Sequence, residues 1–96
     1  MMILVTYDVA TWDKGGARRL RRVAKACQNF GQRVQSSVFE CSVDSVKLAQ
    51  LRAALAAEID PQKDSLRFYF LGKHWQNRVE HVGARASYDP EGLLLI

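Results

Sequence analysis

The stretch from residue 2 to residue 8 (MILVTYD) constrains the fold of this chain more than any other part of the sequence. In an extended strand, Ile3, Val5 and Tyr7 lie on one side and Leu4 on the other, because side chains alternate between the two faces. A strand that is apolar on both sides is typical of the centre of a sheet whose two faces are both covered. We therefore expect residues 2–8 to form a central strand.

Two helices are predicted from apolar residues at helical spacing. The first follows the glycine pair at 15–16 and runs for about 14 residues, and Gly31 is the expected glycine just past its end. Asp44 or Ser45 caps the second helix, which ends before Pro61.

Further strands are predicted between and after the helices. Residues 32–43 (QRVQSSVFECSV) are rich in β-branched and aromatic residues, and they form either one long strand or two strands that meet near Ser36 and Ser37. Residues 65–71 (SLRFYFL) form another strand. In the tail that follows, a turn signal at 89–92 precedes a closing apolar run (LLLI).

This order of elements predicts an α+β protein with the ferredoxin-like βαββαβ sandwich, in which both helices cover one face of an antiparallel sheet. We expect one domain over residues 1–96, with a core at 1–71 and a C-terminal tail at 72–96 that contributes an extra strand. No helix is predicted for the second face, and the closing run would be an exposed edge strand. Both features predict a homodimer in which the tails pair with the partner subunit.

Composition excludes several other classes of protein. The 96 residues are 48% hydrophobic and 25% charged, which is typical of one small globular domain. No apolar run approaches the roughly 20 residues of a membrane span, and the N-terminus lacks the features of a signal peptide. Cys27 and Cys41 have no repeated spacing and indicate a reducing compartment. We expect a cytoplasmic protein without a membrane partner.

Positive charge is concentrated in one part of the chain. Of the 14 basic residues, those from Lys14 to Arg33 lie in a window that contains no Asp or Glu. Arg18 and Arg22 stand four residues apart, and each such like-charge pair costs a few tenths of a kcal/mol. A solvated helix face is the alternative, but the uncompensated charge favours a surface that binds nucleic acid. The candidate contacts are Arg18, Arg19, Arg22, Lys25 and Arg33.

Asp8 is the candidate catalytic and metal-binding residue, because it ends the first strand. The alternative is a turn-forming aspartate with no further role. One carboxylate is a poor site for Mg²⁺, which usually takes one or two carboxylates together with phosphate and water. A two-fold axis near the end of the strand would bring Asp8 of each subunit together around one ion.

Other chemistries find little support. His74 and His81 do not have zinc-site spacing with the cysteines, and the glycines at 15–16 lack the rest of a phosphate-binding loop. Trp12 and Trp75 are able to stack on bases, but we favour a packing role for both.

Taken together, four segments resemble the CRISPR-associated protein two (Cas-two) family over residues 1–71: ILVTYDV, RRLRRVAKAC, GQRVQSSVFEC and DSLRFYFL. The segments RVEHVG and DPEGLLLI resemble the tail of that family. The resemblance implies a ferredoxin-like homodimer and a Mg²⁺-dependent endonuclease that acts on RNA or double-stranded DNA during spacer acquisition in antiviral defence. It also implies a partnership with the CRISPR integrase (Cas-one).

The same resemblance assigns roles to individual residues. Asp8 matches the metal-binding aspartate of the family, and Tyr7 matches the aromatic residue before it. Arg18 and Arg19 match the basic residues of the first helix. The second-strand motif matches at Arg33, Ser37 and Phe39, which we expect on one face of an extended strand, with Phe39 packed in the core.

Two functions remain open from the sequence. In the first, paired Asp8 carboxylates hold one Mg²⁺ and the arginines position the phosphate backbone without reading bases. In the second, the chain is a non-catalytic dimeric scaffold that bridges integrase dimers and holds DNA. A ferredoxin-like RNA-binding module ranks last, because the strands lack the paired aromatic residues on which such modules stack bases.

Overall fold

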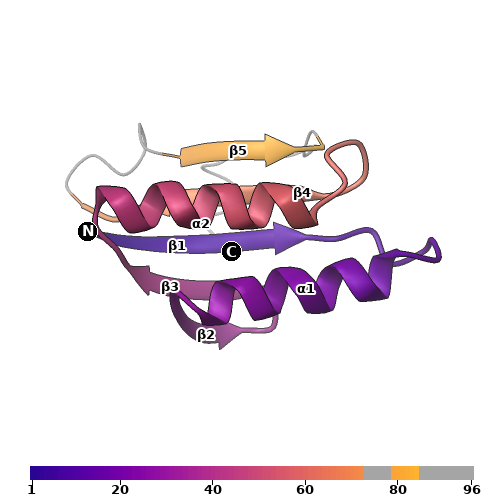
Figure 1. Ribbon diagram of the computed structural model, residues 1–96, viewed down its shortest axis with the longest axis horizontal. Helices are drawn as coiled ribbons and strands as arrows, with labels where there is room; N and C mark the ends of the chain where they lie inside the picture. The colour runs from indigo at the N-terminus through magenta and orange to yellow at the C-terminus, as the bar shows by residue number, and fades with distance from the viewer. Residues whose placement is uncertain (73–78, 85–96) are drawn as a thin grey trace.

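β1 (Met2–Asp8) lies at the centre of an antiparallel sheet with the strand order β2-β3-β1-β4-β5. The computed structural model describes residues 1–72 and 79–84, and two helices lie on one face of the sheet (Figure 1). The remaining elements, in chain order, are α1 (Gly16–Gln28), β2 (Gly31–Gln35), β3 (Val38–Ser42), α2 (Ser45–Glu58), β4 (Ser65–Phe70) and β5 (Val79–Gly83). The expected α+β class and ferredoxin-like order are confirmed, and β5 adds a fifth strand beside β4, at a position before the closing run that was expected to form the extra strand.

β1 is central because it pairs with β3 along one edge and with β4 along the other. Its residues Ile3 and Val5 face the helices and are fully buried. The residues opposite them in the two flanking strands are phenylalanines or a cysteine. The core between sheet and helices is completed by α1 and α2, and its largest fully buried members include Phe39, Phe68 and Leu51. The helices of the described part of the chain are too short or too polar to cross a membrane.

Both helices follow their sequence signals closely. α1 buries Val23, Ala24 and Cys27, and its charged residues other than Arg19 are exposed. α2 begins after Asp44, whose side-chain oxygen accepts a hydrogen bond from the backbone N–H of Lys47 at 2.8 Å. That contact satisfies one of the free amide groups at the start of the helix.

The segment from residue 32 to residue 43 is a hairpin of two strands, and not one long strand. β2 and β3 are joined at Ser36 and Ser37, and Arg33 stands opposite Phe39 across the pair. The register shifts between Arg33 and Gln35, which marks an irregularity of the β-bulge type. The sequence left this choice open because the turn contains no glycine or asparagine.

Gly31 has a different role from the one predicted. α1 ends at Gln28 with Asn29 as its cap, and Gly31 is the first residue of β2 without a positive φ angle. A Cβ atom at this position would collide with the sulfur of Cys41 and the carbonyl oxygen of Glu40. Glycine is therefore required at position 31 by the close approach of β2 to β3. The end of α1 does not depend on it.

The described part of the tail adds a strand to the same chain. β5 pairs antiparallel with β4, with Leu66 opposite Val82. The closing run at 93–96 lies outside the described residues, and the exchange of tails between subunits stays a prediction.

Candidate nucleic-acid and metal site

Asp8 is exposed at the C-terminal end of β1, opposite Ser65 of β4. Ile3, Val5 and Tyr7 of the same strand are part of the core beneath the helices. Because side chains alternate along a strand, Asp8 belongs to the other face of the sheet, which carries neither helix. Its carboxylate is therefore available to solvent or to a second molecule.

Among the residues that the structure describes, Asp8 is not part of a cluster of metal ligands. Within residues 1–72 and 79–84, no three His, Cys, Asp or Glu side chains lie close enough together to hold a metal ion. The oxygen of Asp8 is of the type that Mg²⁺ prefers, so the residue is a suitable ligand but an incomplete site. A second carboxylate from outside the described part of the chain, such as Asp8 of a second copy, would complete a site with two such ligands.

The loop after Asp8 is held by a buried carboxylate that the sequence analysis did not identify. Asp64 has no exposed surface, and it accepts hydrogen bonds from the backbone N–H of Ala10 at 3.0 Å and of Asp60 at 2.8 Å. Arg19 Nε donates to the same carboxylate at 2.8 Å. Asp64 thus ties the loop between β1 and α1 to the loop before β4.

The electrostatics of Asp64 favour its charged form. Burial alone would raise the pKa of this carboxyl group, but the hydrogen bonds from Arg19, Asp60 and Ala10 and the charge of Arg19 outweigh burial and lower the pKa below its ordinary value. The side chain of Arg19 is only 18% exposed. Arg19 therefore lies in a structural ion pair, whereas the sequence predicted a nucleic-acid contact for it.

Asp13 extends this network to the surface. Its carboxylate pairs with Lys63 at 2.7 Å and with Arg19 at 3.4 Å, and these contacts lower the pKa of Asp13, with the hydrogen bond from Lys63 as the largest cause. The Lys63 ammonium lies 5.4 Å from the ring centre of Trp12. Trp12 is 78% exposed, so the predicted packing role is wrong for this residue, and Trp75 lies outside the described residues.

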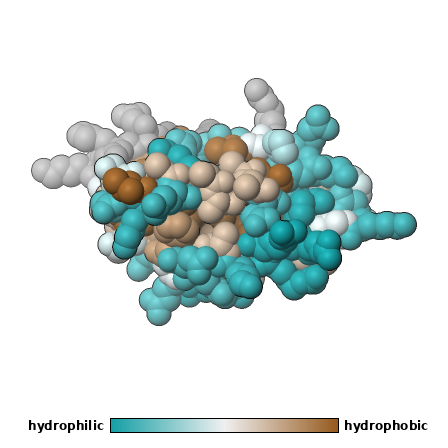
Figure 2. All heavy atoms as spheres, in the orientation of Figure 1, coloured by the Kyte–Doolittle hydropathy of each residue, from teal (hydrophilic) through white to brown (hydrophobic). Residues whose placement is uncertain are grey.

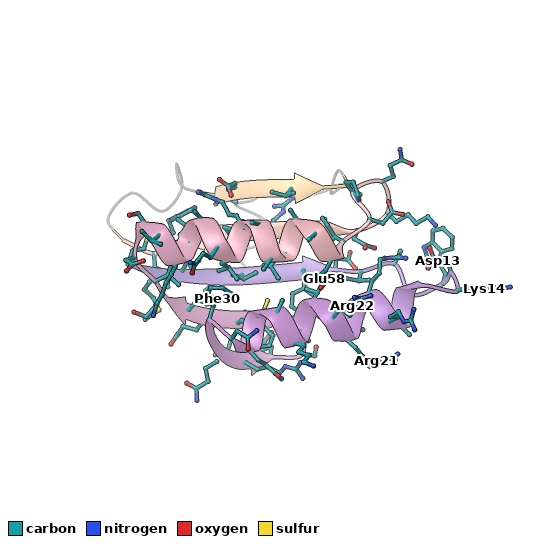
Figure 3. The ribbon with its side chains drawn as sticks, in the orientation of Figure 1. Asp13, Lys14, Arg21, Arg22, Phe30 and Glu58 are labelled. Carbon is teal, nitrogen blue, oxygen red and sulfur yellow. The ribbon has the colours of Figure 1, made fainter. Side chains whose placement is uncertain are left out.

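The other predicted basic residues of α1 lie on its exposed surface. Arg18 and Lys25 are exposed and form no ion pair with another described residue, whereas Arg22 pairs with Glu58 of α2 at 3.2 Å. Figure 3 shows Arg22 on the side of α1 that faces α2 and Arg21 on the opposite side. The surface over α1 is hydrophilic in Figure 2, whereas apolar side chains gather over the α2 half of the molecule.

The residues matched to the second-strand motif meet beside Tyr7. The Arg33 guanidinium lies 5.3 Å from the ring centre of Phe39, and the Phe39 and Tyr7 rings stack with their centres 6.2 Å apart. Phe39 is fully buried, so its expected packing role is confirmed. Ser37 lies in the turn after β2, and the expected common strand face therefore does not include it.

Tyr7 is anchored to the same turn. Its hydroxyl donates a hydrogen bond to the Ser36 carbonyl at 3.2 Å, and its backbone N–H donates to the Ser37 carbonyl at 3.1 Å. Burial raises the pKa of the Tyr7 phenol, and the electrostatic interaction with the Cys27 thiol adds to this effect, while Arg33 opposes it. The phenol therefore stays neutral at physiological pH, as a hydrogen-bond donor.

Comparison with known proteins identifies the family. The family model described as CRISPR associated protein Cas2 matches residues 1–79. The chain belongs to the Cas2 family. A CRISPR-associated endoribonuclease Cas2 of Chlorobaculum tepidum is 60% identical over 96 residues, which cover 100% of both chains. A CRISPR-associated endonuclease Cas2 of Halalkalibacterium halodurans is 57% identical over 95 residues, which cover 99% of both chains.

A solved member of the Cas2 family has the same fold. The crystal structure of Streptococcus pyogenes Cas2 at pH 6.5 aligns with a TM-score of 0.71 and 56% sequence identity, and the match covers 83% of this chain and 96% of that one. The sequence resemblance to the family is thus confirmed over nearly the whole chain. The matched lengths include the positions of Asp8 and of α1.

Proposed function

We propose that this chain is a metal-dependent endonuclease that hydrolyses phosphodiester bonds in RNA or double-stranded DNA during spacer acquisition in antiviral defence. Membership of the Cas2 family and the names endoribonuclease and endonuclease of its relatives support this reaction class. The single observation that carries the proposal is the exposed Asp8 carboxylate at the end of the central strand. A homodimer supplies the second carboxylate, and the CRISPR integrase (Cas-one) is the proposed protein partner.

In this proposal Asp8 from each subunit would hold one Mg²⁺, and the chemistry that the ion would supply is activation of water and neutralisation of charge on the phosphate. Arg18 and Lys25 bind the phosphate backbone from the exposed surface of α1. Arg33 binds phosphate from the hairpin, where the ring of Phe39 supports its guanidinium group. Asp64 and Arg19 keep the chain after Asp8 in a fixed position, so that the carboxylate is presented in one orientation.

Replacing Asp8 with Asn tests the catalytic assignment. The substitution keeps the shape of the side chain and removes its charge, so we expect the dimer to persist and metal-dependent cleavage to be lost. Cleavage of labelled RNA and of duplex DNA, each with Mg²⁺ and with EDTA, is the measurement. Asp44→Asn is the matched control, because it removes one charge at the other end of the sheet and asparagine also caps helices well. Equal cleavage by D8N and the parent contradicts the assignment.

The scaffold function is the second candidate. Two observations favour it. The residues that the structure describes do not complete a metal site, and the basic surface of α1 can hold DNA without any metal. A scaffold would bridge integrase dimers and leave RNA and DNA uncut under every metal condition. The cleavage assay on the parent chain therefore separates the two functions.

A further inference from the structure

A groove of about 380 Å³ lies between α1 and the turn that joins β2 to β3. Residues of three elements line it: Leu20, Arg21 and Ala24 of α1, Arg33 with the serines at 36–37 of the hairpin, and Tyr7 of β1. Arg21 was not among the residues predicted to bind nucleic acid. Tyr7, one of these lining residues, directly precedes Asp8 along β1.

The charge of the groove indicates an anionic ligand. Arg21 and Arg33 both line it, no Asp or Glu does, and neither arginine forms an ion pair with the part of the chain that the structure describes. Arg22, the neighbour of Arg21, is instead neutralised by Glu58 on the α2 side of the helix (Figure 3). Two uncompensated guanidinium groups at one groove favour a phosphate, to which arginine binds through charge-assisted hydrogen bonds.

The groove also has an apolar part that a phosphate alone would not use. Leu20 and Ala24 stand one helical turn apart, so their side chains occupy the same face of α1. Ser36 and Ser37 line the groove from the hairpin, and hydroxyl groups both donate and accept hydrogen bonds. A nucleobase combines a flat apolar face with polar edges, which matches this combination of side chains.

The volume of the groove is sufficient for a ligand of about the size of one nucleotide. A volume of about 380 Å³ is at the lower end of the range for small-molecule sites, which is roughly 300–1,000 Å³. A base that is still paired in a duplex cannot enter such a groove without leaving the stack, and that step costs free energy.

We propose that this groove binds one unpaired nucleotide, with its phosphate at Arg21 and Arg33 and its base against Leu20 and Ala24. This inference goes beyond the proposed function, on which it rests only for the nature of the ligand: it assigns nucleotide binding to Arg21 and to the apolar side of α1, which the cleavage proposal does not use.

Binding of small probes to the full chain tests the site directly. The probes are uridine 5′-monophosphate, its 2′-deoxy analogue and ribose 5-phosphate, each titrated by nuclear magnetic resonance. We expect at least one nucleotide to bind roughly tenfold more tightly than the sugar phosphate, because contact with the base adds to the phosphate contact. The backbone amides of Ala24, Ser36 and Ser37 should shift with the nucleotide. Equal affinity for all three probes, or shifts that avoid the groove, would overturn the proposal.

Arg21→Ala tests the anion contact, and Lys47→Ala is its matched control. Both residues are exposed on helices and each change removes one positive charge, but Lys47 lies on α2 and does not line the groove. We expect nucleotide affinity to fall roughly fivefold or more for R21A and to change less than twofold for K47A. Equal losses in both variants would indicate only a general effect of net charge and would contradict the site.

Cleavage and nucleotide binding are both measured on the parent chain, and the two results together separate this inference from the nuclease proposal. If the parent cuts no nucleic acid but binds the nucleotide in the groove, only the nuclease proposal fails. If the parent cuts and R21A still binds the nucleotide like the parent, the groove inference fails.

Discussion

Asp64 carries the clearest energetic consequence of any single residue in this chain. Its carboxylate is fully buried between Arg19 and two backbone amides, so the charge is compensated only while these partners stay in place. Removing one member of a buried ion pair typically costs 3–5 kcal/mol, because the other charge is left uncompensated, and the hydrogen bonds are lost as well. The residue therefore affects both the stability of the fold and the position of the loop after Asp8.

We predict that Asp64→Asn lowers the free energy of unfolding by about 3 kcal/mol at pH 7, as measured by urea titration with circular dichroism.

The pKa of Asp64 is lower in the folded chain than its ordinary 3.8, so the unfolded chain binds more protons in acid. The stability that this carboxylate contributes is complete above about pH 5 and is lost as the pH falls below about 4. D64N should lose less stability than the parent between pH 5 and pH 3. A parallel pH dependence of stability in D64N and in the parent would contradict this role of the Asp64 carboxylate. Asp60→Asn, measured in the same way, is the control.

The thiol of Cys27 gives a second prediction for a single residue. Burial raises its pKa to about 12, with a smaller contribution from Cys41, against an ordinary value of 9.0. The thiolate is the reactive form, so at pH 8 its fraction is lower by roughly a thousandfold. We expect an aromatic disulfide reagent to react slowly with the folded protein and rapidly with both cysteines in urea. Fast labelling of Cys27 in the folded chain would show that the contact between α1 and the sheet opens easily.

Among the elements, α2 offers the most direct test of a local sequence signal. Asp44 accepts the hydrogen bond from the Lys47 amide and begins the helix, and no acidic residue follows in its first turn. We predict that Asp44→Ala lowers the free energy of unfolding by about 1 kcal/mol, whereas Asp44→Asn leaves it nearly unchanged, in urea titrations at pH 7. Equal losses in the two variants would mean that the charge matters and the cap does not.

Elements whose signal is local could be predicted from the sequence, and contacts across the chain could not. β1 and both helices were identified at or near their observed bounds because residue alternation and helical spacing depend on neighbouring positions. The hairpin stayed undecided because Ser36 and Ser37 are compatible with either form. Asp64 was missed for a different reason: its partners Ala10 and Arg19 are 54 and 45 residues away, and only the folded sheet brings them together. Arg21 was missed because the groove exists only once α1 lies beside the hairpin.

At the scale of the whole molecule, the two faces of the sheet carry different candidate functional residues, because both helices lie on one face. They bury one face and present the basic surface of α1, while Asp8 belongs to the face that carries neither helix. A second copy that docks on this face would bring its own Asp8 to the same region. The reaction centre would then belong to the dimer and to neither chain alone.

Mixed dimers provide the test at this scale. If one metal needs both Asp8 carboxylates, a dimer that contains one D8N subunit is inactive, and activity falls with the square of the fraction of parent chains. Equal amounts of parent and D8N chains, allowed to exchange subunits, should then retain about one quarter of the cleavage rate at constant total protein. Independent sites in each subunit would retain about one half. Cleavage of one RNA substrate across a series of mixing ratios distinguishes the two curves, with Asp44→Asn chains mixed in the same ratios as the control. A linear curve would mean that each chain completes its own site, and the two-fold arrangement of Asp8 would have to be abandoned.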